Sequence, residues 1–284
     1  MTGQNIFETI SSQYFQLTNS EKKVADYILG HRIDAQYMSI SELAEECDVA
    51  DATISRFCRR LGIGGYNAFK LELAKASMAT RGANTLEKLG QSSSGYAGLC
   101  KKLLNESIVA LEQTANLLDA GQVRQALDLI QRADKVVCMG QGGSMVLAQE
   151  AWSMFSTISP KFVFVPDSHL QINTVALMGP KDVVLFFSYS GSTRDLQDVL
   201  EVAKSRSVKV ILVSRFPKSP GGQKADVVLQ CGANEGPLQA GSCSARIAQM
   251  FVMDVLFQQM YERNLVQAED CREKIAEAVA RKHL

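Results

Sequence analysis

Five short runs of apolar, mostly β-branched residues in the second half of the chain constrain its fold more than any other feature. The runs are residues 135–139, 162–165, 182–187, 208–213 and 226–230. Helical patterns fill most of the intervals between them. Continuously apolar strands that alternate with helices are typical of a parallel sheet covered on both faces. The sequence therefore predicts an α/β domain with a five-stranded parallel sheet and helices on both faces.

The first 80 residues carry helical patterns only and predict a separate all-α domain. Ser39 and Glu42 have the spacing of a capping box at the start of a short helix. After a short turn, a second helix has an apolar face made of Ile54, Phe57, Cys58 and Leu61. A further helix is expected over about residues 68–78. Two short helices joined by a tight turn have the dimensions of a helix-turn-helix.

The formal net charge of zero hides a local asymmetry. Residues 34–52 contain six acidic residues and no basic one, whereas residues 53–81 contain six basic residues and one acidic residue. A neutral protein can bind nucleic acid when one short element holds the positive charge. The alternative is an ordinary surface helix with solvated arginines. The residues predicted to bind DNA, with Thr53, Arg56 and Arg60 on an exposed stripe opposite the apolar face, are Asp51, Thr53, Ser55, Arg56, Arg59 and Arg60.

Two loops rich in glycine and serine follow the first and third apolar runs, and each opens a helical pattern. In an open α/β sheet, ligands bind at the carboxyl ends of the strands near the switch point. The N-terminus of a helix favours a phosphate group. Tight turns and helix caps would explain either loop alone, but two loops at equivalent positions favour a phosphate site. The predicted phosphate-binding residues are Gly140, Gly142, Ser144, Ser188, Ser190, Gly191, Ser192 and Thr193.

Three further polar residues are candidates for contact with a sugar, namely Gln141, His169 and Glu235. A histidine and a glutamate near a sugar phosphate would also suit proton transfer in an isomerisation. Plain hydrogen-bonding or surface roles fit these two residues as well. A dinucleotide site competes for the first loop, but Met145 stands where the G-x-G-x-x-G pattern needs its last glycine.

The remaining composition argues against metals and membranes. Seven cysteines without a C-x-x-C pattern predict reduced thiols, and no histidine has the spacing of a zinc ligand. No metal and no cofactor are expected. The longest apolar run has five residues, and residues 1–10 lack a secretory pattern, so we expect a cytoplasmic protein without a membrane partner. A long helix over about residues 245–261 is apolar on most sides and is expected to be buried or shared with a partner chain.

The weakly patterned residues 80–98 are the best candidate for a linker. The expected domains are a helix-turn-helix DNA-binding domain over residues 1–79 and, after the linker, an α/β domain with flanking helices over residues 99–284.

Taken together, these motifs resemble the RpiR-type transcriptional regulators over almost the whole chain. Residues 52–62, with Gly65, Tyr66, Phe69 and Lys70, are similar to the helix-turn-helix of that family. The loops at 140–144 and 188–193 are similar to the phosphosugar loops of the SIS (sugar isomerase) domain, and residues 167–171 and 245–249 are similar to other stretches of it. The resemblance implies phosphate binding by Ser144, Ser188, Ser190 and Thr193 and DNA contacts by Thr53 and Arg56.

The resemblance also implies a bacterial repressor or activator without catalytic activity that self-associates as a dimer or tetramer. Its partners would be double-stranded operator DNA and a phosphorylated sugar or amino sugar. The alternative is a sugar-phosphate isomerase of the SIS class with a helical N-terminal appendage, against which the arginines at 56, 59 and 60 count. The chain departs from the family at Ala50, where serine commonly starts the recognition helix; Asp51 is the candidate cap in its place.

Overall fold

The computed structural model describes residues 5–89, 95–233, 235, 236, 238 and 242–280. The chain divides into two compact units. The N-terminal unit comprises residues 1–105 and 234–242, and the C-terminal unit comprises residues 106–233 and 243–284.

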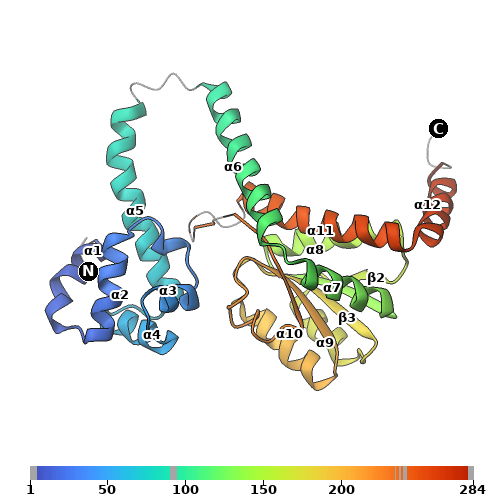
Figure 1. The fold of residues 1–284 in the computed structure, drawn as a ribbon, viewed down its shortest axis with the longest axis horizontal. Helices are drawn as coiled ribbons and strands as arrows, with labels where there is room; N and C mark the ends of the chain where they lie inside the picture. Colours follow the sequence, from blue (N-terminus) through green and yellow to red (C-terminus); the bar gives the residue numbers. More distant parts are fainter. Residues whose placement is uncertain (1–4, 90–94, 234, 237, 239–241, 281–284) are drawn as a thin grey trace. The chain divides into compact units, whose positions relative to one another are not determined.

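The N-terminal unit is helical throughout its described elements (Figure 1). Its elements are α1 (Ile6–Gln13), η1 (Tyr14–Gln16), α2 (Asn19–Gly30), η2 (Ala35–Tyr37), α3 (Ile40–Glu46), α4 (Asp51–Arg60) and α5 (Tyr66–Leu89). Capping boxes start two of the helices, Thr18 with Glu21 before α2 and Ser39 with Glu42 before α3. The predicted box at Ser39 is therefore confirmed.

The core of the N-terminal unit fixes α4 firmly. The ring of Phe57 on α4 meets that of Phe69 on α5 edge to face, with centroids 5.8 Å apart. Ile54, Phe57 and Cys58 are fully buried, as the apolar face of the sequence predicts. The turn after α4 uses Gly62 at φ +78, a conformation that glycine adopts without strain.

The C-terminal unit contains a five-stranded parallel sheet, as predicted. The strands are β1 (Lys135–Gly140), β2 (Phe162–Phe164), β3 (Asp182–Phe187), β4 (Lys209–Ser214) and β5 (Val227–Gln230), and their spatial order is β2-β1-β3-β4-β5. The order reverses at β1, because the chain goes first to β2 on one side and then to β3 on the other. A topological switch point therefore lies between β1 and β3.

Helices cover both faces of this sheet (Figure 1). They are α7 (Ala120–Arg132), α8 (Gly143–Phe155), α9 (Ser168–Ala176), α10 (Arg194–Ser205) and α11 (Cys243–Arg263). On β1, Val136 and Cys138 pack toward α7, α8 and α11, whereas Val137 and Met139 pack toward α9 and α10. This alternation explains the continuously apolar runs, because each face of the strand is buried under a helical layer.

Two further helices flank the sheet domain in the sequence, α6 (Tyr96–Leu117) and α12 (Leu265–Ala280). The end of α6 joins the core of the C-terminal unit through Ala110 and the buried Thr114. One face of α11 is buried, with Val252, Met253 and Leu256 in the core, whereas Phe251 and Val255 are only half-buried. In the part of the chain that the structure describes, no helix combines the length and the apolar character needed to cross a membrane.

Most of the stretch predicted as a linker is helical. Helix α5 continues past the expected end near Met78 to Leu89, and α6 begins at Tyr96. Residues 90–94 lie outside the described residues. A single glycine such as Gly82 costs a helix about 1 kcal/mol and does not end it, so weak patterning there was a poor guide to the backbone. The expected domain boundaries remain a prediction.

Candidate functional site

The sheet brings the two glycine- and serine-rich loops together at one edge. Gly140, the last residue of β1, lies opposite Phe187, the last residue of β3, in the parallel register. The two loops therefore leave neighbouring strands at the same level. One leads into α8 on one face of the sheet and the other into α10 on the opposite face. Loops that diverge from a switch point in this way flank the crevice where α/β proteins bind ligands.

The first loop packs its backbone closely against the start of α8. A Cβ atom at Gly140 would lie 2.6 Å from the carbonyl oxygen of Ser144. Gly142 takes φ +56 as the N-cap residue of α8. The amide of Ser144 donates to the carbonyl oxygen of Gln141 over 3.1 Å, and that of Met145 donates to Gly142 over 3.1 Å. These two amides are used inside the turn, and the half-buried Ser144 carries its hydroxyl at the same turn.

The second loop begins with a buried serine. Ser188 is 4 % exposed, and its amide donates to the carbonyl oxygen of Val213 on β4. Its hydroxyl is buried and has no hydrogen-bond partner within the described residues. Gly191 follows at φ +59, where a Cβ atom would collide with the hydroxyl of Ser219. Only glycine fits this turn without strain or a clash.

The rest of the second loop is exposed at the start of α10. The hydroxyl of Ser190 accepts a hydrogen bond from the amide of Ser192 over 3.3 Å. Thr193 is the N-cap residue of α10, yet its side chain makes no capping bond. The structure thus collects the predicted hydroxyls beside the beginning of a helix. Their role as phosphate ligands stays a prediction.

The candidate sugar-contacting residues differ in how they are held. Gln141 donates from Nε2 to Oε1 of Gln171 on α9 over 2.8 Å. His169 is exposed in the first turn of α9. The carboxylate of Glu235 accepts a hydrogen bond from the amide of Ser242 over 3.2 Å. Glu235 and Ser242 belong to the N-terminal unit, so the place of Glu235 beside the loops stays a prediction.

Sequence reasoning missed Gln171 as a site residue. It is fully buried, and Nε2 donates to the carbonyl oxygens of Gly140 over 3.2 Å and of Val165 over 2.8 Å. Its carboxamide therefore connects α9 to the end of β1, at Gly140, and to the residue that follows β2, Val165. Its place as a polar residue at the end of the 167–171 stretch could have marked Gln171 as a candidate. Nothing in the local pattern predicts its hydrogen-bond partners.

In the helix-turn-helix, α4 places only part of the predicted stripe at the surface. Asp51, Arg56, Arg59 and Arg60 are exposed, and Ser55 is half-buried. Thr53 is 8 % exposed, and its hydroxyl accepts a hydrogen bond from Nη2 of Arg56 over 3.1 Å. The prediction that Thr53 is exposed is wrong, because residues four apart share a helix face and Thr53 lies one turn before the buried Phe57.

Arg60 connects α4 to α2 within the unit. Its Nε lies 3.1 Å from Oε1 of Glu21, and its Nη1 donates to the carbonyl oxygen of Gln16 over 2.8 Å. Burial by itself raises the pKa of Glu21, but hydrogen bonds from Thr18 together with the charge and hydrogen bond of Arg60 outweigh it and lower the pKa. Arg60 therefore anchors α4 within the unit, which distinguishes it from Arg56 and Arg59.

The start of α4 has no side-chain cap. Ala50 is the N-cap residue and supplies no side-chain acceptor. The carboxylate of Asp51 instead accepts a hydrogen bond from the hydroxyl of Ser41 on α3, at 2.9 Å. The expectation that Asp51 caps the helix is therefore wrong. Its side chain joins the two helices of the motif.

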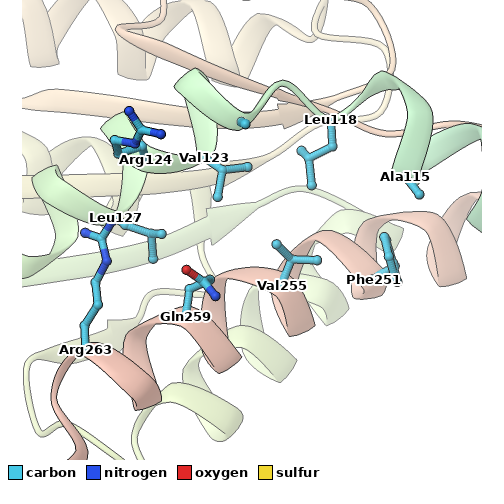
Figure 2. A pocket seen from close by; sticks show the side chains of 10 residues that line it. Ala115, Leu118, Val123, Arg124, Leu127, Phe251, Val255, Gln259 and Arg263 are labelled. Atoms are coloured by element: carbon cyan, nitrogen blue, oxygen red, sulfur yellow. The ribbon is translucent and has the colours of Figure 1, made fainter.

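A separate hollow of about 430 Å³ lies between α7 and α11 beside the end of α6, and none of the residues that line it belongs to the two loops (Figure 2). Val123, Leu127 and Val255 contribute apolar side chains to it. At one end, Arg263 forms an ion pair of 2.7 Å with Asp128. Among the described residues there is no group of three or more His, Cys, Asp or Glu side chains that would suit a metal ion.

The chain combines a helix-turn-helix unit with a five-stranded parallel α/β sheet that carries two glycine- and serine-rich loops at its switch point. The family description "Helix-turn-helix domain, rpiR family" matches residues 4–80, and "SIS domain" matches residues 129–259. A Haemophilus influenzae protein named as an uncharacterized HTH-type transcriptional regulator is 31% identical, over 89% of this chain and 88% of the relative. The chain belongs to the rpiR family of HTH-type transcriptional regulators with a SIS domain.

A second named regulator agrees with this assignment, and two solved structures resemble the fold in whole or in part. The HTH-type transcriptional regulator HexR of Escherichia coli is 28% identical, over 97% of this chain and 94% of HexR. The Vibrio vulnificus NanR protein, solved in complex with ManNAc-6P, superposes with a TM-score of 0.84 at 24% identity, covering 97% of this chain and 98% of NanR. The phosphoheptose isomerase GmhA from Neisseria gonorrhoeae resembles part of the fold, with a TM-score of 0.51 at 18% identity over 59% of this chain and 100% of GmhA.

Proposed function

We propose that this regulator binds operator DNA through α4 and senses a phosphorylated sugar or amino sugar in its SIS domain. The observation that carries the proposal is the register of β1 and β3, which places the two serine-rich loops side by side where α8 and α10 begin. Helix starts and hydroxyls hold a phosphate group without a basic side chain. The complex of NanR with ManNAc-6P supports an amino-sugar phosphate as the effector class.

A sugar-phosphate isomerase is the alternative, since isomerases share part of the fold. An isomerase needs a base and an acid positioned over one substrate. Here His169 is exposed, and the carboxylate of Glu235 is bonded to a loop amide. The family of named regulators and the exposed arginines on α4 favour the regulator without catalytic activity.

Regulation follows from linkage between the two ligands. The protein acts in the cytoplasm as a dimer or tetramer, with two helix-turn-helix units on a near-palindromic operator. The effector binds one arrangement of the oligomer better than another, and so changes the spacing of the DNA-binding units. If the effector changes the affinity for operator DNA by some factor, bound operator DNA changes the affinity for the effector by the same factor.

Alanine at Arg56 is expected to weaken operator binding by about 1–3 kcal/mol if its guanidinium contacts a base. Arg60→Ala is the matched variant on the same helix, because its side chain is bound to Glu21 and Gln16. It should lower the melting temperature of the N-terminal unit while leaving the salt dependence of DNA binding unchanged. Fluorescence anisotropy on a duplex selected by the wild-type protein from random DNA measures the affinity and its salt dependence, and thermal denaturation measures the melting temperature. Unchanged affinity in Arg56→Ala and Arg59→Ala would remove α4 from the role.

Phosphorylated sugars are expected to bind far more tightly than the same sugars without phosphate. ManNAc-6P and free ManNAc form the first pair, compared by calorimetry, followed by a panel of hexose 6-phosphates in thermal shift. A ligand that binds only the folded protein raises its melting temperature. Equal affinity for ManNAc-6P and ManNAc, if both bind, would refute the phosphate site.

A further inference from the structure

A network of two carboxamides joins the first loop to α9. Gln171 is fully buried, with Nε2 bonded to the carbonyl oxygens of Gly140 and Val165 at 3.2 and 2.8 Å. Its Oε1 accepts from Nε2 of Gln141 at 2.8 Å. Gly140 and Gln141 belong to the loop that leads into α8, so the network ends at the crevice edge.

The chemistry of the partners fixes the orientation of both carboxamides. A backbone carbonyl only accepts hydrogen bonds, so the nitrogen of Gln171 must face Gly140 and Val165, and both of its hydrogens are used. The oxygen of Gln171 then faces Gln141, which must donate the hydrogen bond from its own nitrogen. The oxygen and the second N–H of Gln141 remain, and no described residue bonds to either.

We infer that Gln171 is a positioning residue and that Gln141 reads the carbon skeleton of the effector. The oxygen of Gln141 accepts a hydrogen bond from a hydroxyl or amide N–H of the sugar, while the loop hydroxyls hold the phosphate. This inference rests on the proposed function and adds to it a specificity group. A ligand that offers phosphate alone, without a donor on its carbon skeleton, does not use this contact.

The test compares inorganic phosphate with two sugar phosphates, ManNAc-6P and glucose 6-phosphate, by calorimetry on the full chain. Gln141→Ala removes the acceptor and should lower the affinity for a sugar phosphate that binds about three- to tenfold, well beyond its effect on inorganic phosphate. Gln171→Met keeps the side chain's length but frees Gln141 to rotate, and should reduce the same selectivity ratio. The double variant should lose no more affinity for the sugar phosphate than Gln141→Ala alone, because both changes remove the same contact between Gln141 and the sugar.

The outcomes separate this inference from the proposed function. Ser190→Ala should weaken inorganic phosphate and sugar phosphate together, which reports on the phosphate site alone. Wild-type selectivity in Gln141→Ala overturns the inference while the proposed function stands. Equal weakening of both probes by Gln171→Met, or additive losses in the double variant, also overturns it. Gln141→Met leaves both buried carbonyl bonds of Gln171 intact, so it decides the question if Gln171→Met does not fold. Binding of no probe by the wild-type protein refutes both.

Discussion

Replacing Ser190 by alanine is expected to weaken the binding of a phosphorylated sugar by about tenfold to a hundredfold, and Ser144→Ala should do the same. A hydrogen bond to a charged group contributes roughly 1.5–3 kcal/mol, which corresponds to these factors. Ser190 is exposed before α10, and Ser144 stands in the first turn of α8. Calorimetry with the tightest-binding sugar phosphate measures the loss, and the response of operator binding to that ligand should disappear in parallel.

Ser205→Ala is the matched control, because Ser205 is an exposed serine at the far end of the same helix α10. It should bind the effector like the wild-type protein. Operator binding without effector should stay nearly intact in all three variants, since α4 belongs to the other compact unit. A Ser144→Ala protein that responds normally to the sugar phosphate would contradict the phosphate site.

Gly140→Ala is expected to cause the largest loss of stability, about 3 kcal/mol in the unfolding free energy of the C-terminal unit. The added Cβ would lie 2.6 Å from the carbonyl oxygen and 2.8 Å from the carbonyl carbon of Ser144. These are backbone atoms at the start of α8, so the helix itself must move off β1. Calorimetry should locate the effect in the thermal transition that a bound sugar phosphate raises.

Gly143→Ala is the control for this change. Gly143 is the first residue of α8, and a Cβ atom there meets nothing within 4 Å. It also lacks a positive φ, so alanine should leave stability unchanged or raise it slightly. Equal melting temperatures for Gly140→Ala and Gly143→Ala would mean that the close approach of β1 and α8 does not limit the fold.

Local patterns predicted the elements well and their partners poorly. The five strands and the two loops are visible in the sequence because apolar runs and glycine-serine clusters are local signals. Thr53 was predicted to be exposed because it is polar, but it is buried because it lies on the same helix face as Phe57, one turn later. The bond of Arg60 to Glu21 and that of Gln171 to Gly140 join segments far apart in the chain. No spacing rule predicts such pairs, since the tertiary fold creates them.

The position of β2 at the edge of the sheet has a consequence for the order of folding events. β2 pairs with one side of β1 only, which leaves the other side of β1 for β3, the strand that precedes the second loop. The two loops are separated along the chain by α8, β2, α9 and β3, and they meet only when β1 and β3 pair. Such non-local pairing forms slowly relative to local helices. An unfinished chain that has made β1 but not β3 therefore presents only the first of the two loops, and the two loops come together only once the centre of the sheet is complete.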